Sequence, residues 1–322
     1  MNLDLLVSNL TNPAFLFFIL GIIAVKLKSD LEIPTNSSKF ISLYLLFSIG
    51  FKGGQELAHE NFSIEIAWSM LFGIAISLLI PFYTFFILKR SLNIYDSAAI
   101  AAAYGSVSAV TFVTAVSYLD IQKLPLHGHM VAIMALMESP AIIAGLILMS
   151  MYSKEKNNTI SKMSVVKHSF TNGSVLLILG SLIIGLLANA RQAEGIKPFT
   201  NDIFKGFLAI FLLDMGITSG RNLNSFVSNG AFPLFFAIFI PLINGSVVSI
   251  LSSLVTQNIE NRFMFAVLAA SASYIAVPAA MKIAIPKANP GLYLPMALAV
   301  TFPLNITFGM PLYLFISGIN FF

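Results

Sequence analysis

The sequence predicts an all-α polytopic membrane protein of about ten spans, arranged as a five-plus-five inverted-topology repeat. Composition is the first reason: 57% of the 322 residues are hydrophobic, 10% are charged, and the mean hydropathy is +0.87. Soluble domains carry about 25% charged residues, so this chain cannot cover a water-facing surface of its size. Two matched landmarks are the second reason. FSIGFKGGQEL at 47–57 returns as LDMGITSGRNL at 213–223, and the serine-rich stretch at 101–111 returns at 269–278, which indicates a duplication.

Ten apolar segments account for the predicted spans, since a helix needs about 20 residues to cross the hydrocarbon. Segments 3, 5, 8 and 10 reach that length easily, whereas segments 1, 2, 6 and 7 are near the short limit. Five segments fall in each half, and because five is odd, the second half is expected to enter the membrane upside down. In chain order the segments are 13–29, 37–54, 65–88, 94–118, 127–152, 173–190, 202–220, 231–256, 261–284 and 291–319.

The charged residues predict the boundaries and the orientation of the halves. Residues 1–152 form the first repeat and 173–322 the second, and the polar stretch 153–172 is the linker between them. Of the 18 Lys and Arg residues, twelve fall on the linker's side of the membrane and six on the side of the termini. This bias predicts a multi-pass protein of the inner (plasma) membrane with a cytoplasmic linker and both termini outside. The net charge of +4 is spread over short loops, so it indicates topology and not nucleic-acid binding.

Segments 4 and 9 are predicted to be broken helices. Gly105-Ser106-Val107-Ser108 and Ser271-Ala272-Ser273 place hydroxyls and bare backbone in the middle of a span, and Pro278 removes an amide donor. Irregular backbone survives at that depth only beside a cavity or another protein segment. A broken helix exposes the amides that begin its second half, which can bind an anion. The alternative is that small residues only allow close helix packing, but their occurrence in both halves favours the site.

Two carboxylates lie inside predicted spans, Glu138 in segment 5 and Asp214 in segment 7. Such groups are costly in hydrocarbon and usually face a cavity, a cation or each other. Both are therefore candidates for coupling to an ion or a proton. For Asp214 the alternative is a structural carboxylate at a helix break, bonded to the amides of Thr218 or Ser219.

The sequence contains no sign of a resident metal or of enzymatic chemistry. Cysteine is absent, which excludes disulfides and thiolate sites. His127-Gly128-His129 has the look of a metal pair, but no third ligand is near it in the sequence, so an interfacial, water-facing role is expected. Nucleotide, zincin and nucleophile-elbow motifs are absent. An intramembrane protease would have to use Glu138 and Asp214, the only candidate acids.

Three runs resemble the cyanobacterial sodium-dependent bicarbonate transporter family: AASASYIAVPAAMKIAIPKANP at 269–290, YGSVSAVT at 104–111 and MESPA at 137–141. The resemblance covers nearly the whole chain. It implies ten spans, with a gate domain of segments 1, 2, 6 and 7 and a core domain of segments 3–5 and 8–10. It also implies a homotrimer that binds bicarbonate where the two broken helices meet, with sodium beside it.

The chain departs from that family in two places. Tyr274 stands where the family carries an aspartate after its serine run, and the linker is much shorter than in cyanobacterial members, whose linker helps to engage a small PII-like regulator. The first departure predicts that most sodium dependence is lost, because a negative charge beside the anion is tolerable chiefly with sodium between them, whereas a phenol can donate to an oxyanion directly. The second argues against such a regulator.

The predicted function is secondary active transport of a small anion, with bicarbonate first and sodium as the possible co-substrate. Transport of another organic carboxylate, with proton coupling or none, and an anion channel stay open, since helix N-termini bind any small oxyanion. No other cofactor is expected. The residues predicted to bind substrate are Gly105, Ser106, Val107, Ser108, Thr111, Ser271, Ser273, Tyr274 and Ile275, and those predicted to couple an ion are Glu138, Ser108 and Asp214.

Overall fold

The computed structural model describes residues 13–60, 63–153, 173–227 and 230–319. This described part of the chain consists of helices, with no strand, as the sequence predicts. The predicted linker, apart from Ser153, and both ends of the chain lie outside the described residues.

The described part of the first half contains six helices, and segment 4 is divided between two of them. They are α2 (Pro13–Lys26), α3 (Thr35–His59), α4 (Ile64–Leu88), α5 (Ile94–Gly105), α6 (Ala109–Ile121) and α7 (Gly128–Tyr152). The second half begins with α9 (Gly173–Leu187), α10 (Ala190–Lys197), the π-helix η1 (Pro198–Asp202), α11 (Phe204–Val227) and α12 (Ala231–Leu251). A 3-10 turn, η2 (Ser252–Leu254), leads to α13 (Ile259–Ala270) and α14 (Ala276–Ala284), which divide segment 9.

Segment 10 is a series of short helical pieces. Its prolines at 295, 303 and 311 each lack an amide donor, and the chain responds with two π-helical stretches. The pieces are α15 (Pro290–Pro295), η3 (Met296–Thr301), α16 (Phe302–Leu304), η4 (Asn305–Gly309) and α17 (Met310–Ser317).

Six stretches of the described chain are long and apolar enough to span a membrane. Within the described residues, the other four predicted spans are not long and apolar enough to be counted in this way. The described parts of segments 1 and 6 are short helices, α3 carries Lys39, Lys52 and Glu56, and segment 9 is interrupted between α13 and α14. The protein is thus a helical, multi-pass membrane protein. The six spans are Ile64–Leu88, Ile94–Ile121, Gly128–Tyr152, Ala190–Arg221, Ala231–Leu254 and Pro290–Ser317.

Helices α2 and α11 pack closely along each other, as do α3 and α9. Glycines allow both approaches: a Cβ atom on Gly216 of α11 would lie 2.0 Å from the carbonyl oxygen of Phe18, and one on Gly185 of α9 would lie 2.2 Å from that of Phe51. Small residues at helix contacts let backbones approach in this way.

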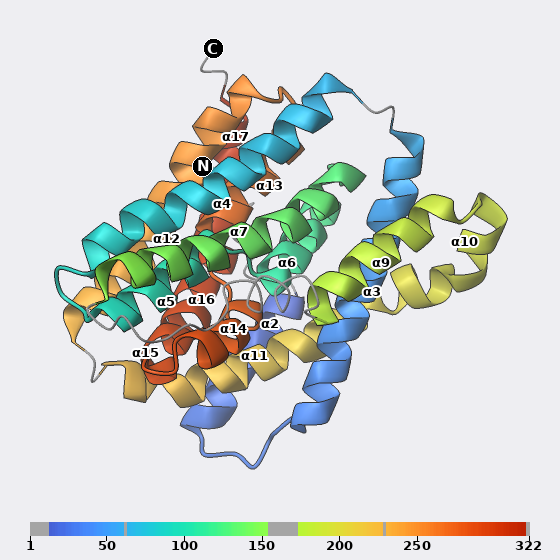
Figure 1. Cartoon of the computed structure of the whole chain (residues 1–322). Coiled ribbons are helices and arrows are strands. Elements are labelled where there is room, and N and C mark those ends of the chain that lie inside the picture. The colour runs from blue at the N-terminus through green and yellow to red at the C-terminus, as the bar shows by residue number, and fades with distance from the viewer. Residues whose placement is uncertain (1–12, 61–62, 154–172, 228–229, 320–322) are drawn as a thin grey trace.

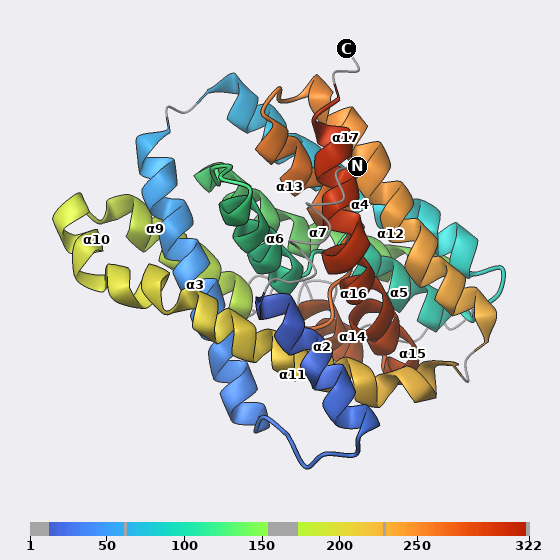
Figure 2. The same ribbon diagram turned by 180° about the vertical axis from the view of Figure 1, so that it is seen from behind.

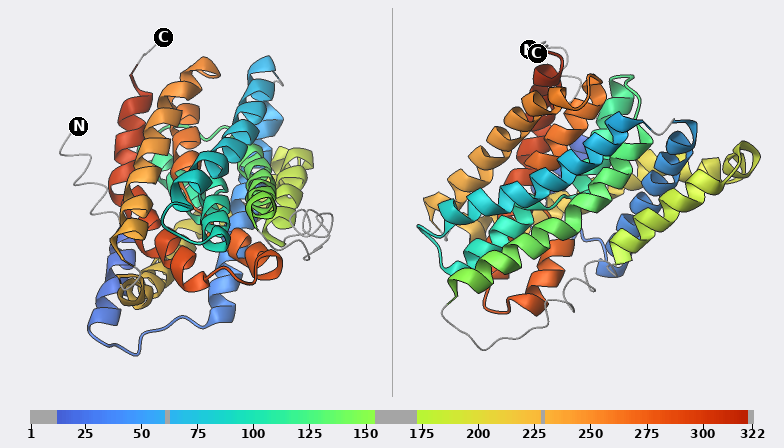
Figure 3. Two further views of the ribbon diagram at one scale, coloured as in Figure 1. Left: turned by 60° about the vertical axis from the view of Figure 1, so that its left-hand side comes forward. Right: turned by 45° about the horizontal axis from the view of Figure 1, so that its top comes forward.

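The broken helices lie at the centre of the molecule. Helices α3, α9 and α10 lie at one edge, with α4, α12 and α17 toward the other, in both Figure 1 and Figure 2. Helix α10 projects from the edge that it shares with α3 and α9, and Figure 3 shows it apart from the main bundle. Every residue of α5 from Asp96 to Gly105 and of α13 from Asn261 to Ala270 is buried. The two interrupted segments are therefore the innermost part of the fold.

Candidate substrate-binding site

Both innermost segments are interrupted in their serine-rich stretches. Helix α5 ends at Gly105 and α6 begins at Ala109, while α13 ends at Ala270 and α14 begins at Ala276. Gly105 is required by a close approach, because a Cβ atom there would lie 2.1 Å from Cγ of Pro81 in α4. Both breaks fall where the sequence predicts them.

The two breaks hydrogen-bond to each other. The Ser273 amide donates to the Ala103 carbonyl at 2.8 Å, and the Ser108 amide donates to Ser271 Oγ at 3.0 Å. Backbone groups inside a membrane must be satisfied within the protein, and each interrupted stretch supplies a partner for the other. The structure therefore brings together two runs that are more than 160 residues apart.

Asparagines complete the bonding at the end of α13. Asn305 Nδ2 donates to the Ala270 carbonyl at 2.7 Å, and Asn244 Nδ2 donates to the Ala269 carbonyl at 3.3 Å. These carbonyls have no partner inside their helix because the helix ends there. Sequence reasoning missed both asparagines, although an amide side chain in the middle of an apolar segment was an available signal.

Two helix N-termini begin at this crossing. Ser108 caps α6 by accepting from the Thr111 amide at 3.2 Å, and Ser273 Oγ accepts from the Val277 amide of α14 at 3.3 Å. The amides of Ala109 and Ala276, one in each first turn, have no hydrogen-bond partner within the described chain. Unpaired first-turn amides carry the positive end of the helix dipole and attract anions.

A cavity of about 20 Å³ lies between the two N-termini. It has room for one small molecule or ion, since a single water needs roughly 10–15 Å³ measured in this way. Besides the two broken segments, three helices, α3, α7 and α9, contribute side chains to the lining. The lining residues are Leu46, Val107, Ser108, Ala109, Met134, Glu138, Ile178, Ser273, Tyr274, Ile275 and Ala276.

Six of the predicted site residues line this cavity: Val107, Ser108, Ser273, Tyr274, Ile275 and Glu138. The others lie nearby without lining it. Ser106 is fully buried, and its hydroxyl has no hydrogen-bond partner. Gly105 and Ser271 hold the crossing as described above, and Thr111 binds the cap of α6. A direct role for these four in binding stays a prediction.

Tyr274 lines the cavity from the α14 side. The residue is 8% exposed, and its ring meets Phe302 edge-on at 6.2 Å between centroids. Its hydroxyl lies near Ser108 but makes no hydrogen bond of ordinary geometry within the described chain. A phenol in that position is a donor available to a bound oxyanion.

The two candidate coupling acids lie in different places. Glu138 lines the cavity and has no ion-pair or hydrogen-bond partner among the described residues. Asp214 is buried in α11, where it accepts a hydrogen bond from the Ser38 hydroxyl of α3, and it does not line the cavity. Ser38 is a partner that the sequence did not suggest, because α3 and α11 are far apart along the chain.

Three apolar residues that reach the lining from other helices were also missed. Leu46 comes from α3, Ile178 from α9 and Met134 from α7. Nothing distinguishes them from other apolar residues of their segments. Only the packing of α3 and α9 beside the broken helices brings them to the cavity.

Comparison with known proteins identifies a transporter family. The family model described as the Na⁺-dependent bicarbonate transporter superfamily matches residues 13–317. A search of the curated proteins finds no match. The match spans both broken segments, the cavity and nearly all of the described helices, so the chain belongs to the Na⁺-dependent bicarbonate transporter superfamily.

Proposed function

We propose that the protein is a secondary active transporter that moves bicarbonate, held between the first turns of α6 and α14. The observation that carries this proposal is the convergence of two helix N-termini, each with an unpaired amide, on one cavity. Membership of a transporter family agrees with it and suggests that the chain is not an enzyme.

The size of the cavity supports a small anion over a bulky organic carboxylate. About 20 Å³ suits a group of a few heavy atoms. The walls from Leu46, Met134 and Ile178 are apolar and would exclude water from the bound ion, which strengthens its attraction to the amides. An anion channel would need a continuous open pore, whereas this cavity measures only about 20 Å³.

We propose that the chain is built from two inverted repeats of five spans, with segments 4 and 9 equivalent. The helix pairs support this reading, because an exchange of the halves maps α2 with α11 onto α9 with α3. The same exchange maps the contacts of α4, α5 and α7 onto those of α12, α13 and α17. The α2, α3, α9 and α11 group would be the gate domain, and the remaining helices the core domain.

Coupling is assigned to Glu138. Its carboxylate and the Ser108 hydroxyl share the cavity and are oxygen ligands of the kind that sodium takes, and a proton could replace sodium on the carboxylate. With Tyr274 in place of an aspartate, no second carboxylate adds to the repulsion between Glu138 and the anion. We therefore expect transport that depends only weakly on sodium, with the remaining dependence passing through Glu138. Asp214 is a weaker candidate, because it is already bonded to Ser38.

The expected setting is the plasma membrane, with both termini outside and the linker in the cytoplasm. Large apolar side chains exposed on α4 and α12, among them Leu79 and Phe235, suit contact with lipid. A homotrimer assembled through the gate domain is proposed from the family resemblance, and no PII-like regulator is proposed.

Uptake of labelled bicarbonate into proteoliposomes tests the site. Ser273→Leu places a bulky side chain between the two N-termini and should abolish saturable uptake while the protein still elutes as a single species in detergent. Glu138→Gln keeps the shape of the side chain and should leave anion binding in place but remove any response to a sodium or proton gradient. Unchanged uptake by a correctly folded Ser273→Leu protein would contradict the proposed site.

A further inference from the structure

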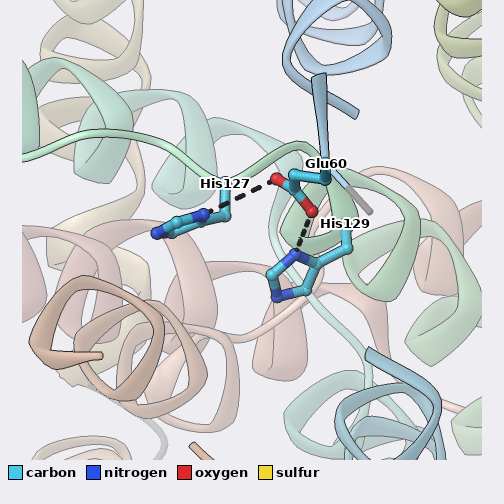
Figure 4. A group of neighbouring side chains, drawn as sticks. All are labelled: Glu60, His127 and His129. Carbon is cyan, nitrogen blue, oxygen red and sulfur yellow. Dashed lines mark hydrogen bonds and ion pairs between the residues drawn. The ribbon is translucent and has the colours of Figure 1, made fainter. Parts of the chain in front are cut away.

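The histidine pair that the sequence left without a third ligand has one in the structure. Figure 4 shows the Glu60 carboxylate between the rings of His127 and His129, with one oxygen toward each. Glu60 caps the C-terminus of α3, His127 caps the N-terminus of α7, and His129 lies in the first turn of α7. One potential ligand atom from each residue lies within 4.8 Å of the others.

The spacing of these atoms is close to that of a coordination sphere. His129 Nδ1 lies 2.7 Å from Glu60 Oε2, and His127 Nδ1 lies 3.6 Å from Glu60 Oε1. Ligand atoms around a tetrahedral zinc ion, with bonds near 2.1 Å, are about 3.4 Å apart. Small rotations of the three side chains would therefore place a metal ion among them.

Gly128 explains why the two histidines flank the carboxylate. A Cβ atom at this position would lie 2.2 Å from the Gly53 carbonyl oxygen of α3, so only glycine lets α7 begin so close to α3. The Gly128 amide also donates to Glu60 Oε1 at 2.7 Å. The His-Gly-His sequence thus combines a close contact between α3 and α7 with two imidazoles that face the same carboxylate.

A second carboxylate contacts the other ring nitrogen of His127. Glu260, in the first turn of α13, accepts from or shares a proton with His127 Nε2 at 3.0 Å. Histidines that bind metals through one nitrogen usually donate from the other to a carboxylate, which fixes the tautomer and the ring. Nδ1 of His127 is therefore the nitrogen directed toward Glu60.

Charge and access agree with a cation site. The Glu60 carboxylate supplies negative charge between the two imidazoles, and a bound ion would replace the protons that join these groups. The side chain of His127 is 28% exposed and that of Glu60 is 17% exposed, which leaves a route from solvent.

We propose that Glu60, His127 and His129 bind a divalent transition-metal ion such as Zn²⁺, with water completing the coordination. Imidazole nitrogens with a carboxylate suit this class of ion better than Mg²⁺ or Ca²⁺. The ion would tie the end of α3 to the start of α7. A consequence for transport rests on the proposed function. With α3 in the gate domain and α7 in a moving core domain, a metal ion that joins the two helices slows transport.

Zinc titration of the full chain tests the site. The protein is purified without a histidine tag, stripped with EDTA, and titrated with Zn²⁺ in a calorimeter. The absence of cysteine excludes competing thiolate sites. We expect one Zn²⁺ per chain, and affinity lowered by more than about 100-fold in Glu60→Gln and in His127→Gln. Glu260→Gln should weaken binding by about 10-fold, as expected for a residue that positions a ligand.

His59→Gln is the matched control, because His59 is exposed in the last turn of α3 and lies outside the cluster. Its affinity should equal that of the unmodified protein. Equal zinc affinity in all variants, or no binding at all, would overturn the site. Uptake assays then test the consequence: zinc should slow the unmodified protein and spare His127→Gln. If zinc binds to a protein that transports the anion and does not slow it, the tie between α3 and α7 is refuted. If the protein transports no anion, the proposed function is refuted, and the titration alone decides whether the metal site exists.

Discussion

One of the two hydrogen bonds described above between the broken helices can be removed by deleting a single oxygen atom. In Ser271→Ala the Ser108 amide loses its partner, Ser271 Oγ at 3.0 Å. A buried donor left unsatisfied costs about 1–3 kcal/mol. In a chain of this size each kcal/mol lowers the unfolding midpoint by roughly 2 °C, so a drop of about 2–6 °C is expected.

Ser106→Ala provides a matched comparison for that variant. Ser106 and Ser271 are equally deep, at 0% and 1% exposure, and both lie in a helix break. The Ser106 hydroxyl has no partner, so its removal should leave the midpoint unchanged or raise it slightly. The assay is thermal unfolding of the purified proteins in one detergent, followed by circular dichroism. Equal midpoints for the two variants would refute the idea that the crossing is held by this bond.

Three further predictions concern packing and assembly. Gly105→Ala should lower the unfolding midpoint by an amount corresponding to about 1–3 kcal/mol, because the new methyl group would overlap the ring of Pro81; a folded protein of unchanged midpoint would contradict this packing. Gly185→Val should disrupt the α3–α9 pair by colliding with the Phe51 carbonyl, whereas Gly180→Val on the same helix meets nothing within 4 Å and should be tolerated, as the yield of monodisperse protein will show. Native mass spectrometry in mild detergent should show a trimer, and a stable monomer would count against assembly through the gate domain.

Local chemistry was sufficient to predict the breaks in segments 4 and 9. Their serine-rich runs place hydroxyls and small side chains in the middle of a span, and the structure interrupts both helices there. The meeting of the two breaks was expected from the family resemblance, which implies an anion site where the two broken helices meet. Segment 10 was expected as one span, and its prolines at 295, 303 and 311 divide it into short pieces with π-helical stretches.

Contacts between distant helices could not be predicted in the same way. Leu46 and Ile178 reach the cavity only because α3 and α9 pack beside it, and an apolar residue in an apolar segment gives no sign of that. Glu60 joins His127 and His129 because Gly128 lets α7 begin against α3, a contact between residues nearly 70 positions apart. Single-sequence patterns report the neighbours of a residue along its own helix, and these neighbours belong to other helices.

The central claim is that the cavity between α6 and α14 selects a small anion. The most direct measurement is uptake of labelled bicarbonate by the unmodified protein in proteoliposomes, with sodium present or replaced, and with competing anions of increasing size. The account predicts saturable uptake that falls only modestly without sodium, is inhibited by formate or nitrate, and is unaffected by a bulky carboxylate such as cholate. Uptake of cholate, or bicarbonate uptake that does not saturate, would contradict it.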